Sequence, residues 1–107
     1  MANVFKNALA RDIGTSAVTL YSAPAAKNSI CIELDVCNTT NSAVSCSAFI
    51  TKGGADYYIV KNAPVPVGGT LQIISGQKIV LADTDAIKII STATTSLDAV
   101  ASILEDV

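Results

Sequence analysis

The chain has 107 residues, of which 50% are hydrophobic and only 15% are charged, and its formal net charge is −2. An average soluble domain carries about 25% charged residues, so this composition is typical of a protein that packs against neighbours. The basic residues form no run, which argues against nucleic acid as a partner because phosphate contacts need clustered Lys and Arg. The length predicts one domain over residues 1–107.

Membrane insertion and export are not indicated either. No apolar stretch approaches the roughly 20 residues that a transmembrane helix requires. The opening residues Met1-Ala2-Asn3-Val4-Phe5-Lys6 lack the basic and then apolar order of a signal peptide. We therefore expect a soluble protein that is made in the cytoplasm.

The first element, over residues 4–13, has two interpretations. Phe5, Leu9 and Ile13 recur at every fourth position ahead of Gly14, which would suit a short helix with a C-terminal glycine. The same residues can also form a strand. We favour the strand because every later segment has β character.

The clearest strand signal covers residues 30–36, where apolar and polar side chains alternate. A helix would distribute the aliphatic side chains around its circumference, whereas a strand places them on one face. A second alternating stretch follows at 44–51, and the polar segment 38–42 between the two predicts a hairpin. The two faces of the first stretch are Ile30, Ile32, Leu34 and Val36 on one side and Cys31, Glu33, Asp35 and Cys37 on the other.

The other segments continue this rhythm of short strands and turns. A strand at 17–22 ends at Ala23-Pro24, because proline has no N–H for a ladder. Gly53-Gly54 predicts a tight turn, and residues 64–69, with two prolines and two glycines, predict a rigid corner outside the sheet. Further strands are expected at 56–61, 70–75, 78–81, 86–91 and 97–105, with turns at 76–77 and 82–85. Eight or so strands spaced by roughly 8–12 residues predict an all-β fold, an antiparallel β-sandwich or jelly roll.

The residue types argue against catalysis. The chain has no histidine, which excludes a Ser-His-Asp or Cys-His arrangement within it, and it has no phosphate-binding glycine loop ahead of a helix. We therefore predict a protein that is not an enzyme and has no cofactor. The acidic pairs Glu33 with Asp35 and Asp83 with Asp85 could offer oxygens to calcium, but we favour a solvated face and a self-bonded turn, with no metal site.

The three cysteines cannot form a closed set of internal disulfides, because their number is odd. Cys31 and Cys37 are about 20 Å apart on one extended strand, too far to bridge each other. They share the expected solvent face with the acidic residues. Two interpretations stay open for them: disulfides between subunits, or half-covered thiols at an interface, which we favour. Cys46 is predicted to be a core residue.

The tyrosines also allow two interpretations. Tyr57 and Tyr58, together with Tyr21, could form a platform for stacking carbohydrate. Only 5% of the chain is aromatic and tryptophan is absent, so we favour core and interface packing, with Tyr57 and Tyr58 as candidate interface residues.

Five stretches of the chain carry a resemblance to known proteins: Met1-Ala-Asn-Val-Phe-Lys-Asn-Ala8, residues 19–25, residues 58–71, residues 78–88 and residues 100–105. In these stretches the chain resembles a family of small structural proteins of tailed bacteriophages. At Thr84-Asp85 this chain departs from the Gly-Asp of most similar proteins. The resemblance implies a place in the virus particle and no enzymatic activity.

These observations lead to a functional hypothesis. We expect a non-enzymatic subunit of a tailed-phage virion that is made in the host cytoplasm and binds copies of itself and other virion proteins. As a homo-oligomer it would serve in capsid decoration or in the neck, collar or tail. The alternative is a host-surface or glycan-binding adhesin module on the same fold.

Overall fold

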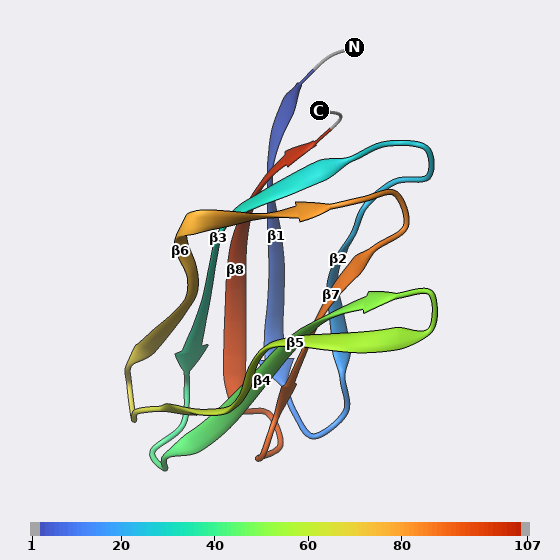
Figure 1. Cartoon of the computed structure of the whole chain (residues 1–107). Helices are drawn as coiled ribbons and strands as arrows, with labels where there is room; N and C mark the ends of the chain where they lie inside the picture. The colour runs from blue at the N-terminus through green and yellow to red at the C-terminus, as the bar shows by residue number, and fades with distance from the viewer. Residues whose placement is uncertain (1–2, 106–107) are drawn as a thin grey trace.

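The computed structural model describes residues 3–105 as two antiparallel four-stranded sheets packed face to face (Figure 1). The all-β sandwich expected from the sequence is confirmed, and residues 4–13 form a strand. The first sheet has the order β1-β8-β3-β6 and the second has the order β2-β7-β4-β5. The strands are β1 (Val4–Ile13), β2 (Val18–Ser22), β3 (Ser29–Asn38), β4 (Val44–Lys52), β5 (Ala55–Val65), β6 (Thr70–Leu81), β7 (Ala86–Ser91) and β8 (Leu97–Glu105).

The described residues are folded as one long hairpin. In the pairs β1–β8, β2–β7, β3–β6 and β4–β5, the numbers of facing residues always sum to between 107 and 110. The tip of this hairpin is the turn between Lys52 and Ala55, at the middle of the sequence. Successive pairs lie alternately in the two sheets. Within each sheet one further ladder, β3–β8 in the first and β4–β7 in the second, joins the two strand pairs to each other. A double-stranded ribbon wrapped in this way around a core is a jelly roll.

The tip has the backbone that its two glycines permit. Gly53 and Gly54 have φ values of 59° and 82°, the combination of a type I′ turn, which suits the twist of a two-residue hairpin. The turn predicted at this position is confirmed. It allows β4 and β5 to pair within one sheet.

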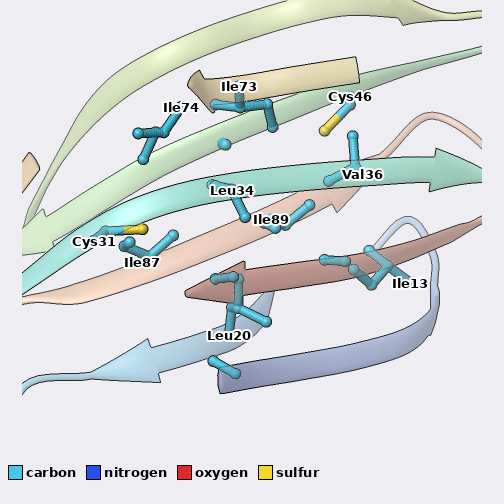
Figure 2. Close-up of a cluster of buried hydrophobic side chains, with 14 of the residues drawn as sticks. Ile13, Leu20, Cys31, Leu34, Val36, Cys46, Ile73, Ile74, Ile87 and Ile89 are labelled. Atoms are coloured by element: carbon cyan, nitrogen blue, oxygen red, sulfur yellow. The ribbon is translucent and has the colours of Figure 1, made fainter. Parts of the chain in front are cut away.

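The core lies between the sheets and takes one face from each strand (Figure 2). β8 shows the alternation most clearly, since its inward side chains are at most 1% exposed, as the two-residue rhythm predicts. Two of these side chains are alanines, which take up little of the space between the sheets. The inward side chains of β8 are Leu97, Ala99, Ala101 and Ile103.

The hairpin predicted across residues 38–42 is wrong. β3 belongs to the first sheet and β4 to the second, so this segment crosses between the sheets. Its length and polarity suit either connection, and packing decides between them. The Asn38 side chain fixes the crossing, because its amide donates to the carbonyls of Ser42 (2.8 Å) and Val65 (3.1 Å). Its carbonyl oxygen accepts the backbone N–H of Thr40 at 2.9 Å.

The alternation predicted along residues 30–36 is interrupted. The ladders from β3 to both β6 and β8 shift register between Cys31 and Glu33. Cys31 therefore points into the core ahead of the shift, and Leu34 and Val36 point into it afterwards. The assignment of Cys31 to the solvent face is wrong, because a β-bulge reverses the facing of a strand wherever it occurs.

Two further boundaries differ from the predictions. Residues 76–77 are not a turn, since β6 continues to Leu81 through a bulge in which Gly76 and Lys78 have φ values of 98° and 45°. The rigid corner begins only at Pro66, whose carbonyl accepts the N–H of Gly69 at 2.9 Å. The two residues before it still pair with β4, because strand pairing continues to Val65.

Thr84 carries backbone strain in the turn at residues 82–85. Its φ is 65°, a left-handed conformation that a β-branched residue adopts at a cost of roughly 1–3 kcal/mol. The turn itself forms as predicted, with the N–H of Asp85 donating to the carbonyl of Ala82 at 3.0 Å. The departure from Gly-Asp therefore leaves the fold of this turn intact.

Substitution of Asn38 tests the role of the crossing segment. Asn38→Ala would leave the Val65 carbonyl and the Thr40 N–H without their side-chain partners at a site that is 1% exposed. We expect the free energy of unfolding in urea to fall by about 2–4 kcal/mol. Asn41→Ala, at an exposed position of the same segment, should change it by less than about 0.5 kcal/mol. Equal effects of the two substitutions would contradict this role.

Candidate interaction surface

An apolar row crosses the outer face of the first sheet. The register places Leu104 beside both Phe5 and Ile30, and Ile30 beside Val80. The row faces away from the core because the sequence neighbours of its members on β3 and β8 are buried, and the neighbours of Val80 on β6 are half-buried Ile79 and buried Leu81. Phe5 is 76% exposed and Val80 is 66% exposed. We call these four residues the apolar row.

A second apolar pair lies on β1 and β8, separated from the apolar row by the facing residues Asn7 and Ser102. Leu9 faces Val100 across the two strands, and these side chains are 64% and 51% exposed. Next to this pair the surface is hollowed by about 330 Å³, where the β1–β8 register shifts after Ala10. The hollow is lined by Leu9, Ala10, Arg11, Asp98, Ala99 and Val100.

Glu33 and Asp35 lie on the same outer face, where Asp35 continues the cross-strand line of Leu9 and Val100. Partial burial, with a hydrogen bond to Glu33 and the charge of Glu33 as smaller causes, raises the pKa of Asp35 to about 6. One oxygen of Asp35, Oδ1, is buried and has no hydrogen-bond partner within the described residues. Within residues 3–105, no three Cys, Asp or Glu side chains lie close enough together to hold a metal ion.

The other acidic pair has a structural role. The carboxylate of Asp85 is buried and accepts the backbone N–H of Ala82 at 3.0 Å. It also binds the ammonium of Lys52 at 3.1 Å, which fixes the tip of the β4–β5 hairpin to the turn before β7. Asp83 is exposed, and its carboxylate lies 3.4 Å from the N–H of Ala26. The self-bonded turn expected here is therefore present.

The cysteines differ in their accessibility. Cys31 and Cys46 are fully buried and Cys37 is half-buried, and all three are free thiols. Burial raises the pKa of both Cys31 and Cys46 to about 11. The core position predicted for Cys46 is confirmed. Of the pair considered for disulfides between subunits, Cys37 alone has an accessible side chain in the folded protein.

The two candidate interface tyrosines are both exposed, Tyr57 by 58% and Tyr58 by 49%. They are consecutive residues of β5 and so point to opposite faces of the sheet. The Tyr58 ring packs against Phe49 with 5.0 Å between centroids, and the ammonium of Lys61 lies 5.0 Å from its centre. The two rings therefore do not form a common platform.

Tyr21 belongs to a polar cluster that joins the two sheets, and sequence reasoning missed this cluster. Its hydroxyl lies 2.9 Å from the Ser29 hydroxyl and donates to the carboxylate of Glu105. The Lys6 ammonium, 2.8 Å from Glu105, and the Tyr21 hydroxyl hold the pKa of Glu105 below its usual range. Burial, and then the bond to Glu105, raise the pKa of Tyr21 to about 12. No sequence signal links these residues, because they come from four different strands.

The outer face of the first sheet thus offers two groups of exposed apolar side chains, with the carboxyl groups of Glu33 and Asp35 on the same face. Mixed apolar and polar side chains are typical of protein–protein contacts. Within residues 3–105, no helix is long and apolar enough to cross a membrane.

Comparisons with known proteins bear on the fold alone. No family model and no curated protein sequence matches the chain. A similar solved structure is a chain of the T13 IBDV viral particle, described as a missing link in the evolution of icosahedral viruses. The TM-score is 0.60 at 12% identity, and the match covers 96% of this chain. It covers 30% of that chain, so this protein spans less than a third of its length.

Thiol labelling tests the positions of the cysteines. In the folded protein at pH 8, we expect Cys37 to react with an aromatic disulfide reagent well before Cys31 and Cys46, whose burial both blocks access and disfavours the thiolate. In denaturant all three should react at similar rates. The Cys37→Ser variant should lose the fast phase. A fast phase that survives in this variant would show that a buried position has been misassigned.

The Asp35 carboxyl should make stability depend on pH. Because its folded-state pKa is raised from 3.8 to about 6, its favourable contribution is complete below about pH 4 and is lost as the pH rises through 6. We expect Asp35→Asn to be more stable than the parent at pH 8, on the order of 1 kcal/mol after allowance for solvent screening. The two proteins should be nearly equal at pH 4. Urea unfolding at both pH values measures this.

Asp83→Asn is the matched control for this measurement, since Asp83 is exposed in a turn. It should leave the pH dependence between 5 and 8 as in the parent. Parallel stability curves for the parent and Asp35→Asn over this range would contradict the predicted role of Asp35.

Proposed function

We propose that this protein is a non-enzymatic structural subunit of a tailed-phage virion, which packs beside copies of itself and other virion proteins. Capsid decoration, the neck or collar and the tail are the positions we consider. The observation that carries the proposal is the apolar row of Phe5, Leu104, Ile30 and Val80 on the outer face of the first sheet.

An exposed apolar row suits a subunit that is covered by a neighbour. Soluble monomers rarely expose contiguous apolar patches larger than a few hundred Å². Here the exposed apolar side chains are held on the rigid surface of a sheet, so a partner that covers them meets a preformed surface. The low charge of the chain, 15% of its residues, reduces the cost of removing that surface from water.

The fold and the resemblance support the place in a virus particle. Jelly rolls occur in viral capsid proteins, although also in lectins and cupins. The similar solved structure comes from a viral particle, and five stretches of the sequence resemble structural proteins of tailed phages. The adhesin alternative receives less support, because Tyr57 and Tyr58 lie on opposite faces of β5 and offer no shared stacking surface.

Location of the chain in purified particles tests the proposal. Particles from infected bacteria, separated from lysate on a density gradient, should contain the chain at a constant ratio to the main capsid protein by mass spectrometry. An image reconstruction of these particles should hold the sandwich at symmetry-related positions. A chain that is abundant in lysate but absent from particles would contradict the proposal. Binding of the purified protein to host cells, without a repeated structural position, would favour the adhesin.

A further inference from the structure

The edge of β1 differs from every other sheet edge of the described chain. β1 pairs with β8 through seven consecutive facing residues, from Val4 to Ala10, without a register shift. The ladders of the other three edge strands, β2, β5 and β6, run for at most four facing pairs before an irregularity. Bulges and prolines are the usual means by which proteins protect sheet edges. Residues 4–10 contain neither.

The free side of β1 has backbone groups that only another strand can pair fully. Along an edge strand, alternate N–H and C=O groups point away from the sheet. In the described chain, no backbone hydrogen bond joins residues 4–10 to any strand other than β8. The exposed side chains of Phe5 and Leu9 lie along this same strand. The edge is therefore suited to the addition of an extended segment.

We propose that a second copy of the chain supplies this segment, with the two β1 strands antiparallel about a two-fold axis beside Asn7. This axis places each Phe5 opposite the partner's Leu9. Asn7 is also the midpoint of residues 4–10, so the same register uses the whole regular run of both strands. The two first sheets join into one continuous eight-stranded sheet.

The charges of β1 are compatible with this register. Lys6 lies opposite the partner's Ala8, and its ammonium is already bound by Glu105 at 2.8 Å. Arg11 lies outside the paired run. No like charges face each other within residues 4–10, and each copy brings a Phe5 ring toward the partner's Leu9, beside the apolar hollow of about 330 Å³.

The contact is small, so the dimer depends on concentration. A paired run of seven residues is roughly 23 Å long, and strand addition over this length buries less than the roughly 800 Å² per partner of a standard interface. The inference deepens the proposed function by naming one contact through which subunits repeat. If the chain is found in particles but is monomeric at every concentration, the dimer is contradicted and the proposed function is not.

Sedimentation equilibrium of the purified protein, from micromolar concentration to the solubility limit, tests the dimer. Phe5→Lys and Leu9→Glu change exposed side chains, and each should weaken dimerisation by at least about tenfold. The double variant brings each new lysine opposite a new glutamate and should recover dimerisation at low salt. Gln72→Lys, at an exposed position of β6 on the same outer face but at the far edge, should leave it unchanged. A monomeric parent, an unrescued double variant, or dimerisation lost in Gln72→Lys overturns the proposal.

A disulfide at the axis tests the register. Directly opposed residues of antiparallel strands have Cα atoms about 4.5–5.5 Å apart, within the range that a disulfide spans. In a Cys37→Ser background, Asn7→Cys should therefore give a crosslinked dimer under oxidation. Phe5→Cys should not, because the two copies of position 5 lie four residues out of register, roughly 13 Å apart. Equal crosslinking of both variants, or none in Asn7→Cys, overturns the assigned axis.

Discussion

Each strand of the first half of the chain pairs with one of the second half about the Gly53-Gly54 turn, and the rest of the structure depends on this pairing. A ribbon with one apolar face cannot stay flat in water, because that face must be removed from solvent. Wrapping the ribbon around itself buries the face and closes the β3–β8 and β4–β7 ladders. The jelly roll thus follows from a central turn and one apolar side on each strand.

Polar side chains hold the wrapped ribbon together where the chain passes from one sheet to the other. Asn38 binds the crossing between β3 and β4 to the end of β5. Lys52 and Asp85 fix the tip of the ribbon to the turn before β7, and Tyr21, Ser29, Glu105 and Lys6 close its open end. The contacts from Asn38 to Val65, from Lys52 to Asp85 and from Glu105 to Tyr21 and Lys6 join strands that are distant in sequence. These residues therefore specify how the ribbon wraps and not where the strands form.

The four sheet edges differ in how regular their strands are, and this difference relates the fold to the proposed role. Three sheet edges are interrupted by bulges, whereas β1 is regular over residues 4–10. The exposed apolar side chains of the first sheet include members of β1 and of its neighbour β8. An edge that is both open and apolar allows copies of the subunit to assemble through it without any change in the core of each copy.

The sequence by itself determined the fold class, the central turn and the approximate positions of the strands, although it predicted two strands where β6 is one. A period of two residues cannot place its apolar side chains on one side of a helix, and paired glycines at the midpoint allow the left-handed backbone that the turn needs. It also determined the inward face of β8 and the burial of Cys46, because these follow from local alternation.

Tertiary structure alone decided the path of residues 38–42, the burial of Cys31 and the four-strand cluster around Tyr21. The register of β3 shifts at Ile32 against both β6 and β8, and a register shift leaves no mark in the alternation of a single strand. Facing within a regular strand is a local property, whereas register shifts and the partner of a strand depend on how the whole ribbon closes.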